Sequence, residues 1–89
     1  MIIHMSKFGN VLTSRPAGGE AYKALRPRLS ELKSGDNIKL DFSGVDVLTP
    51  SWADEFLAPL LKDYPKQVVW LNTDNASVQE TLKILGYDR

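Results

Sequence analysis

The chain has 89 residues, no cysteine, and 11 basic against 11 acidic side chains. A chain of this length forms one domain, residues 1–89, whose small core leaves little room for a large pocket. The balanced charge argues against nucleic-acid binding through a basic face, and the lack of cysteine excludes disulfides, thiolate metal sites and a cysteine nucleophile.

The hydropathy of the chain bears on its location. No apolar run approaches the roughly 20 residues that a membrane-spanning helix needs. The apolar core of "MIIHMSKF" (residues 1–8) is too short for a signal peptide. We therefore expect a cytoplasmic protein that does not bind a membrane.

The first predicted element is a β-hairpin. The stretch "MIIHM" (1–5) is short and apolar, as an edge strand is, and "FGNVLTS" (8–14) carries alternating Val11. Gly9 and Asn10 between them are typical of a turn.

A first helix is predicted at about residues 18–33. Tyr22, Leu25, Leu29 and Leu32 recur at spacings of three or four and therefore share one helical face. Pro27 lies within this helix, where it removes a backbone donor, and so predicts a bend.

The second half of the chain alternates strands with helices. "IKLDF" (38–42) has the alternation of a half-buried strand, and the apolar stripe from Ser51 indicates a helix that ends before Pro65. "QVVWL" (67–71) is uncharged and β-branched, which favours a central strand with Trp70 in the core. A last helix from Ala76 is predicted, with Asn75 as its cap and Gly86 after its end.

The order of the elements is β-β-α-β-α-β-α. Strands that alternate with helices favour parallel neighbours joined by crossovers. The sequence therefore predicts a small α/β sandwich, with a mixed sheet of about four strands and about three helices packed on it.

The turn before the second helix holds two hydroxyl residues around a proline. Thr49 followed by Pro50 suits an N-cap with proline at the first helical position. Ser51 with Asp54 three positions on is an alternative frame that resembles a capping box. Either frame uses one hydroxyl and leaves the other near a helix N-terminus, where an anion is favoured.

Charged and aromatic residues follow directly. Trp52 suits either the core or an exposed binding anchor. Asp54 and Glu55 are adjacent, so they point about 100° apart and cannot form a facing acid/base pair. If the first two helices pack side by side, the guanidinium of Arg15 is expected to pair with one of these carboxylates.

Three stretches match a recognisable pattern. The pair Ser14-Arg15 precedes the first helix, residues 40–45 read "LDFSGV", and residues 52–55 read "WADE" at the start of the second helix. In this respect the chain resembles the STAS-like family of unknown function, whose small domains are similar to anti-sigma-factor antagonists. The resemblance spans about residues 8–86 and implies a STAS-like fold.

The resemblance also implies a function. Domains of the wider STAS group act as protein-binding switches: a serine or threonine at this turn is phosphorylated by a kinase resembling histidine-kinase ATPases, and the complex then breaks. It therefore implies a regulatory, non-enzymatic interaction domain with a protein partner. Ser51, and secondarily Thr49, are the candidate phosphorylation sites, and Trp52, Asp54 and Glu55 are the candidate partner contacts.

A sensor for a small ligand or nucleotide, which binds an anion at a helix N-terminus, is the alternative. An enzyme is not expected, because the chain lacks a nucleophile–base pair and "PAGGEAY" (16–22) lacks the lysine of a phosphate-binding loop. We expect no cofactor, and no metal, since His4 is the single histidine. The oligomeric state is left open.

Overall fold

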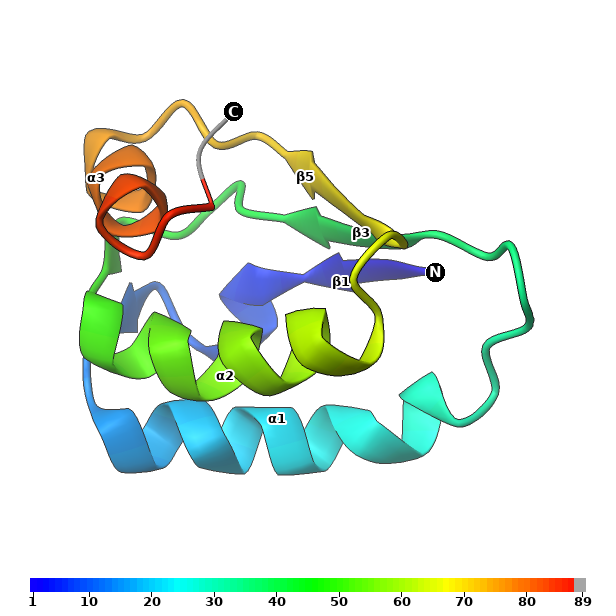
Figure 1. Cartoon of the computed structure of the whole chain (residues 1–89). Helices are drawn as coiled ribbons and strands as arrows, with labels where there is room; N and C mark the ends of the chain where they lie inside the picture. Colours follow the sequence, from blue (N-terminus) through cyan, green and yellow to red (C-terminus); the bar gives the residue numbers. More distant parts are fainter. Residues whose placement is uncertain (88–89) are drawn as a thin grey trace.

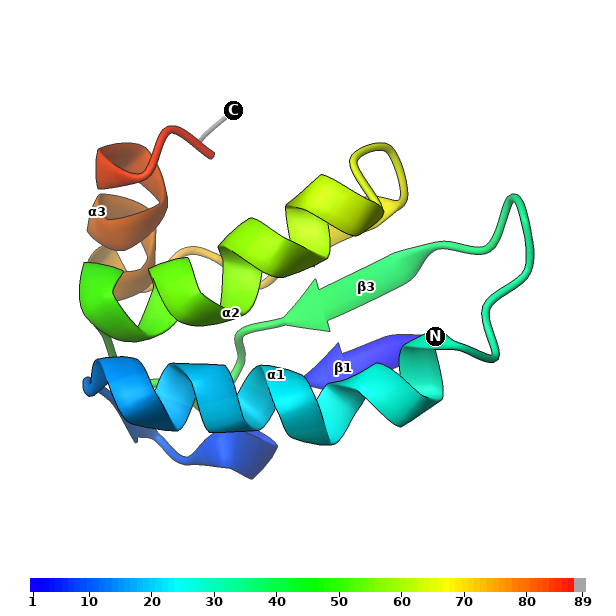
Figure 2. The same ribbon diagram turned by 60° about the horizontal axis from the view of Figure 1, so that its bottom comes forward.

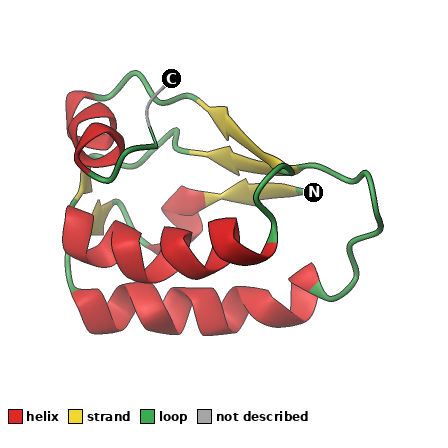
Figure 3. Cartoon of the chain, in the orientation of Figure 1, coloured by secondary structure: helices red, strands yellow, loops and turns green. Residues whose placement is uncertain are grey.

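The computed structural model describes residues 1–87. Three α-helices, one 3-10 helix and five short strands make up this part of the chain (Figure 3). In chain order they are β1 (Ile2–His4), η1 (Met5–Phe8), β2 (Val11–Leu12), α1 (Arg15–Leu29), β3 (Ile38–Asp41), β4 (Val47–Leu48), α2 (Pro50–Asp63), β5 (Val68–Leu71) and α3 (Ala76–Ile84).

The strands form two parallel sheets. Three of them lie in the order β1-β3-β5, and β2 pairs with β4 in a separate two-stranded sheet. Helices α1 and α2 lie side by side on one face of the larger sheet, and α3 lies at the end where β2 and β4 meet (Figures 1 and 2). The predicted α/β sandwich with three helices is confirmed. The predicted mixed sheet of about four strands is instead two all-parallel sheets, of three and two strands.

The predicted hairpin is wrong. One 3-10 turn, η1, separates β1 from β2, and Met5 within it is buried. Gly9 follows with a φ of 128°, a conformation that glycine adopts without strain. The chain therefore changes direction before the turn signal is reached, and each of the two strands pairs with a later strand.

The prediction of a central β5 is also wrong. Strand β3 is central and β5 lies at an edge, with all four of its residues only half-buried. Trp70 is accordingly half-buried rather than a core residue, and its ring lies between the rings of Phe42 and Tyr87, at 6.2 Å and 6.1 Å. An uncharged, apolar strand indicates cover on both faces, but the side chains of β5 alternate between a covered and an uncovered face.

Helix α1 begins earlier than predicted. The hydroxyl of Ser14 accepts a hydrogen bond from the backbone N–H of Ala17 at 3.3 Å, and Pro16 occupies the first turn, where no donor is lost. The helix continues through Pro27 and ends at Leu29. Gly18 and Gly19, which are poor helix formers, obscured this start in the sequence.

The core lies between the larger sheet and the helices. The sheet contributes Ile3, Ile38 and Leu40, and α2 contributes a broad stripe. That stripe consists of Trp52, Ala53, Phe56, Leu57 and Leu60. No helix within residues 1–87 is both long and apolar enough to cross a membrane.

Helix α3 is fixed to the strand that precedes α2. The hydroxyl of Ser77 accepts from the backbone N–H of Leu48 at 2.9 Å, and the buried hydroxyl of Thr81 donates to the carbonyl of Leu48 at 2.5 Å. Asn75 caps the helix as predicted, and Gly86, at a φ of 82°, follows its end. These bonds hold β4, and with it the start of α2, in place.

Candidate functional site

The start of α2 is capped by Thr49. Its hydroxyl oxygen accepts from the backbone N–H of Trp52 at 3.5 Å and donates to the carbonyl of Thr13 at 2.8 Å. Pro50 takes the first helical position. Of the two frames that the sequence left open, Thr49-Pro50 is the one found, and Thr49 also ties α2 to the segment that leads into α1.

Ser51 is therefore not needed as a cap. It lies in the first turn of α2, is partly exposed, and its hydroxyl makes no hydrogen bond to another residue within 1–87. Asp54 and Glu55 follow three and four positions later, so they lie on the same side of the helix as Ser51. A partly exposed serine that does not cap the helix thus lies beside two carboxylates.

Arg15 pairs with both carboxylates, whereas the sequence predicts a pair with one of them. Its Nη1 lies 3.2 Å from Oδ2 of Asp54 and 3.7 Å from Oε2 of Glu55. The three side chains remain 52%, 43% and 44% exposed, so the pairs contribute at most about 1 kcal/mol to stability. Their contribution is geometric: they join the start of α1 to the start of α2.

Trp52 belongs to the core. It is 2% exposed, and its ring stacks on that of Phe56 at 5.2 Å. Helices α1 and α2 meet here, because Gly18 of α1 lies against the main chain of Trp52. The alternative of an exposed anchor is thus excluded, and Asp54 and Glu55 remain as the predicted contacts on the surface.

A second polar cluster lies where the strands of the larger sheet end. Asp41 accepts hydrogen bonds from the backbone N–H and the hydroxyl of Ser43, at 3.0 and 2.8 Å, and from the amide of Asn72 at 2.8 Å. Nδ1 of His4 lies 3.2 Å from its other oxygen. These bonds, that of Asn72 foremost, hold the pKa of the Asp41 carboxyl well below its ordinary value.

Neither Asp41 nor Asn72 is a candidate from the sequence, where His4 stands out only as the single histidine. Asn72 has a φ of 56°, which asparagine tolerates better than most residues. These residues come from three strands distant in the chain, so no local spacing signals the cluster. Within residues 1–87 no group of three or more ligand side chains is arranged to hold a metal ion.

Two small parallel sheets with three helices form a small α/β domain, which is the fold class that the resemblance to STAS-like domains implies. The comparison with family models agrees: residues 23–78 match the model of the STAS-like domain of unknown function (DUF4325). The chain belongs to this family. The match includes Thr49 to Glu55 and leaves Ser14 and Arg15 outside it. No curated protein and no solved structure matches the chain.

Proposed function

We propose that the chain is a non-enzymatic, regulatory protein-interaction domain whose partner binds where α2 begins. The surface in question, called the switch face below, consists of Arg15, Ser51, Asp54 and Glu55. One observation carries the proposal: Thr49 caps the helix, so the partly exposed hydroxyl of Ser51 has no role in the fold.

Modification of Ser51 would change the charge of this face strongly. Unmodified, it carries one positive and two negative side chains. A phosphate on Ser51 would add a charge of about −1.5 to −2 beside Asp54 and Glu55. It would repel these carboxylates and compete with them for Arg15. The charges of the modified face would then no longer match those of a partner that fits the unmodified face.

The partner in this proposal is a kinase resembling the histidine-kinase ATPases. It binds the unmodified switch face and transfers the γ-phosphoryl group of ATP to the hydroxyl oxygen of Ser51. ADP leaves, and the hydroxyl proton is released. The modified face then repels the partner and the complex dissociates.

A charge reversal on the switch face tests the proposed surface. Glu55→Lys places a positive charge next to Arg15, whereas Glu20→Lys changes an exposed acidic residue of α1 that pairs with Lys23 at 3.5 Å. Both variants should fold, because exposed ion pairs contribute little. In affinity capture from the source cell, Glu55→Lys should lose the partner and Glu20→Lys should retain it. Equal retention by both would contradict the proposed surface.

A further inference from the structure

The larger sheet is covered on one face only. Successive side chains of a strand point to opposite faces, and Ile3, Ile38 and Leu40 are the buried residues that face α1 and α2. Val68 and Trp70 of β5 pack against the same core. Among residues 1–87, no helix lies across the opposite face of this sheet (Figures 1 and 2).

That opposite face, called the outer sheet face below, is made of two rows of side chains in register. Each row takes one residue from β1, one from β3 and one from β5, as the pairing of the strands dictates. The rows are Ile2, Lys39 and Val69, then His4, Asp41 and Leu71.

Exposed parallel sheets are unusual, because parallel strands occur almost only where both faces are covered. The two flanks of the outer sheet face are suited to being covered. Ile2 is 47% exposed, and Val69 and Leu71 are half-buried without belonging to the core. These apolar residues gave "QVVWL" the character of a strand covered on both sides.

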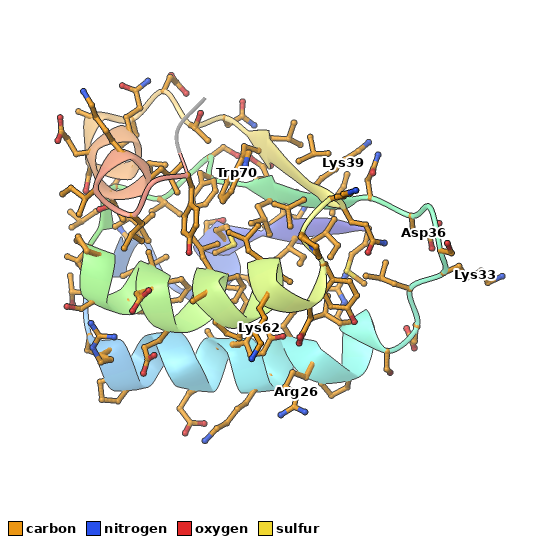
Figure 4. The ribbon with its side chains drawn as sticks, viewed as in Figure 1. Arg26, Lys33, Asp36, Lys39, Lys62 and Trp70 are labelled. Atoms are coloured by element: carbon orange, nitrogen blue, oxygen red, sulfur yellow. The ribbon has the colours of Figure 1, made fainter. Side chains whose placement is uncertain are left out.

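The charges of the central strand indicate what covers this face. Lys39 and Asp41 lie two residues apart on β3 and both belong to the outer sheet face. Figure 4 places Lys39 at the sheet, away from Arg26 and Lys62 on the two helices. Because its hydrogen bonds lower the pKa of Asp41, that carboxylate stays negative at neutral pH.

A surface with one positive and one negative charge along a line can complement itself. Suppose that the two-fold axis lies between the two sheets, parallel to their planes, and crosses β3 at right angles between Lys39 and Asp41. Each Lys39 then faces the Asp41 of the other copy. Val69 then faces Leu71 on the flank. A two-fold axis along the strands would instead place Lys39 against Lys39, and like charges opposed in this way repel each other.

We propose that a second copy of this chain covers the outer sheet face, with the strands of the two sheets running in opposite directions. Two sheets packed face to face with roughly aligned strands are a common arrangement. The proposal does not depend on the switch face, which lies at the start of α2 and uses other residues.

Sedimentation of the full chain over a range of concentrations tests the dimer. We expect a dimer. Lys39→Glu should raise its dissociation constant by at least about tenfold, because the new glutamate of each copy then faces Asp41 of the other copy. Lys62→Glu, an exposed lysine of α2, is the matched control and should leave it unchanged. A monomer throughout, or equal effects of the two variants, would overturn the proposal.

Cross-linking tests the orientation. The chain has no cysteine, so introduced thiols are the only ones present. Because sheets packed face to face lie about 10 Å apart, too far for a direct disulfide, the thiols are joined with a short bismaleimide. An equal mixture of Val69→Cys and Leu71→Cys should then form cross-linked mixed dimers in preference to dimers of either variant alone. If β5 instead faces β1 of the other copy, no mixed dimers form, and that result would overturn the antiparallel arrangement.

Discussion

Gly18 of α1 and Trp52 of α2 meet so closely that no side chain fits between them. A β-carbon added to Gly18 would collide with the carbonyl oxygen of Trp52 and lie 3.0 Å from its carbonyl carbon. Real β-carbons do not approach other atoms at such distances, so α1 and α2 can take these positions only with glycine at residue 18. The contact sets how the switch face is assembled from two helices.

The pair Gly18 and Gly19 gives a matched test of this contact. Gly18→Ala should destabilise the protein by about 1–3 kcal/mol, because the helices must move apart. Gly19→Ala, with nothing within 4 Å of the added carbon, should stabilise α1 by up to about 1 kcal/mol. Urea denaturation of both variants measures the difference in stability. Equal effects would show that the contact of Gly18 with Trp52 does not set the distance between α1 and α2.

The two hydroxyl residues at the start of α2 should contribute differently to stability, as measured by urea denaturation. Thr49→Ala removes the helix cap and the bond to the carbonyl of Thr13, and should cost about 0.5–2 kcal/mol of stability. Ser51→Ala removes a hydroxyl without a partner in the described part of the chain and should change stability by less than about 0.5 kcal/mol. A larger loss for Ser51→Ala would mean that its hydroxyl serves the fold, against the proposed function.

Asp41 should make stability depend on pH in the acidic range. Its folded pKa is lowered from 3.8, so the stabilisation is fully present above that value and is lost as the pH falls toward the folded pKa. Asp41→Asn removes this dependence, so wild type and variant should differ most at neutral pH and converge on acidification. Asp74→Asn, on an exposed loop, should parallel the wild type throughout. Thermal unfolding between neutral and acidic pH measures these differences in stability. A difference between wild type and Asp41→Asn that stays constant with pH would contradict the hydrogen bonds assigned to Asp41.

Local signals in the sequence were sufficient to predict that the three helices exist, though not where α1 begins and ends, and to predict part of the site. Thr49-Pro50 was one of two capping frames that the sequence offered for α2, and Asn75 predicted the cap of α3, because capping depends on residues within one turn. The pairing of Arg15 with Asp54 and Glu55 followed once two adjacent helices were assumed.

Features that depend on distant residues were not predictable in this way. The Gly9-Asn10 signal is equally compatible with the end of a 3-10 turn, so it did not identify the partners of β1 and β2. The edge position of β5 and the contact of Gly18 with Trp52 depend on how whole elements are placed. The cluster around Asp41 requires three parallel strands to end side by side, which only the topology reveals.

In the proposed function, the switch face binds a protein partner and modification of Ser51 releases that partner. The most direct measurement is affinity capture with the full chain as bait, with and without ATP, followed by the intact mass of the bait. We predict a kinase-like partner that is retained without ATP and released as the bait gains one phosphate, with no gain and no release for Ser51→Ala. A partner retained equally in both conditions, with a bait of unchanged mass, would contradict the account.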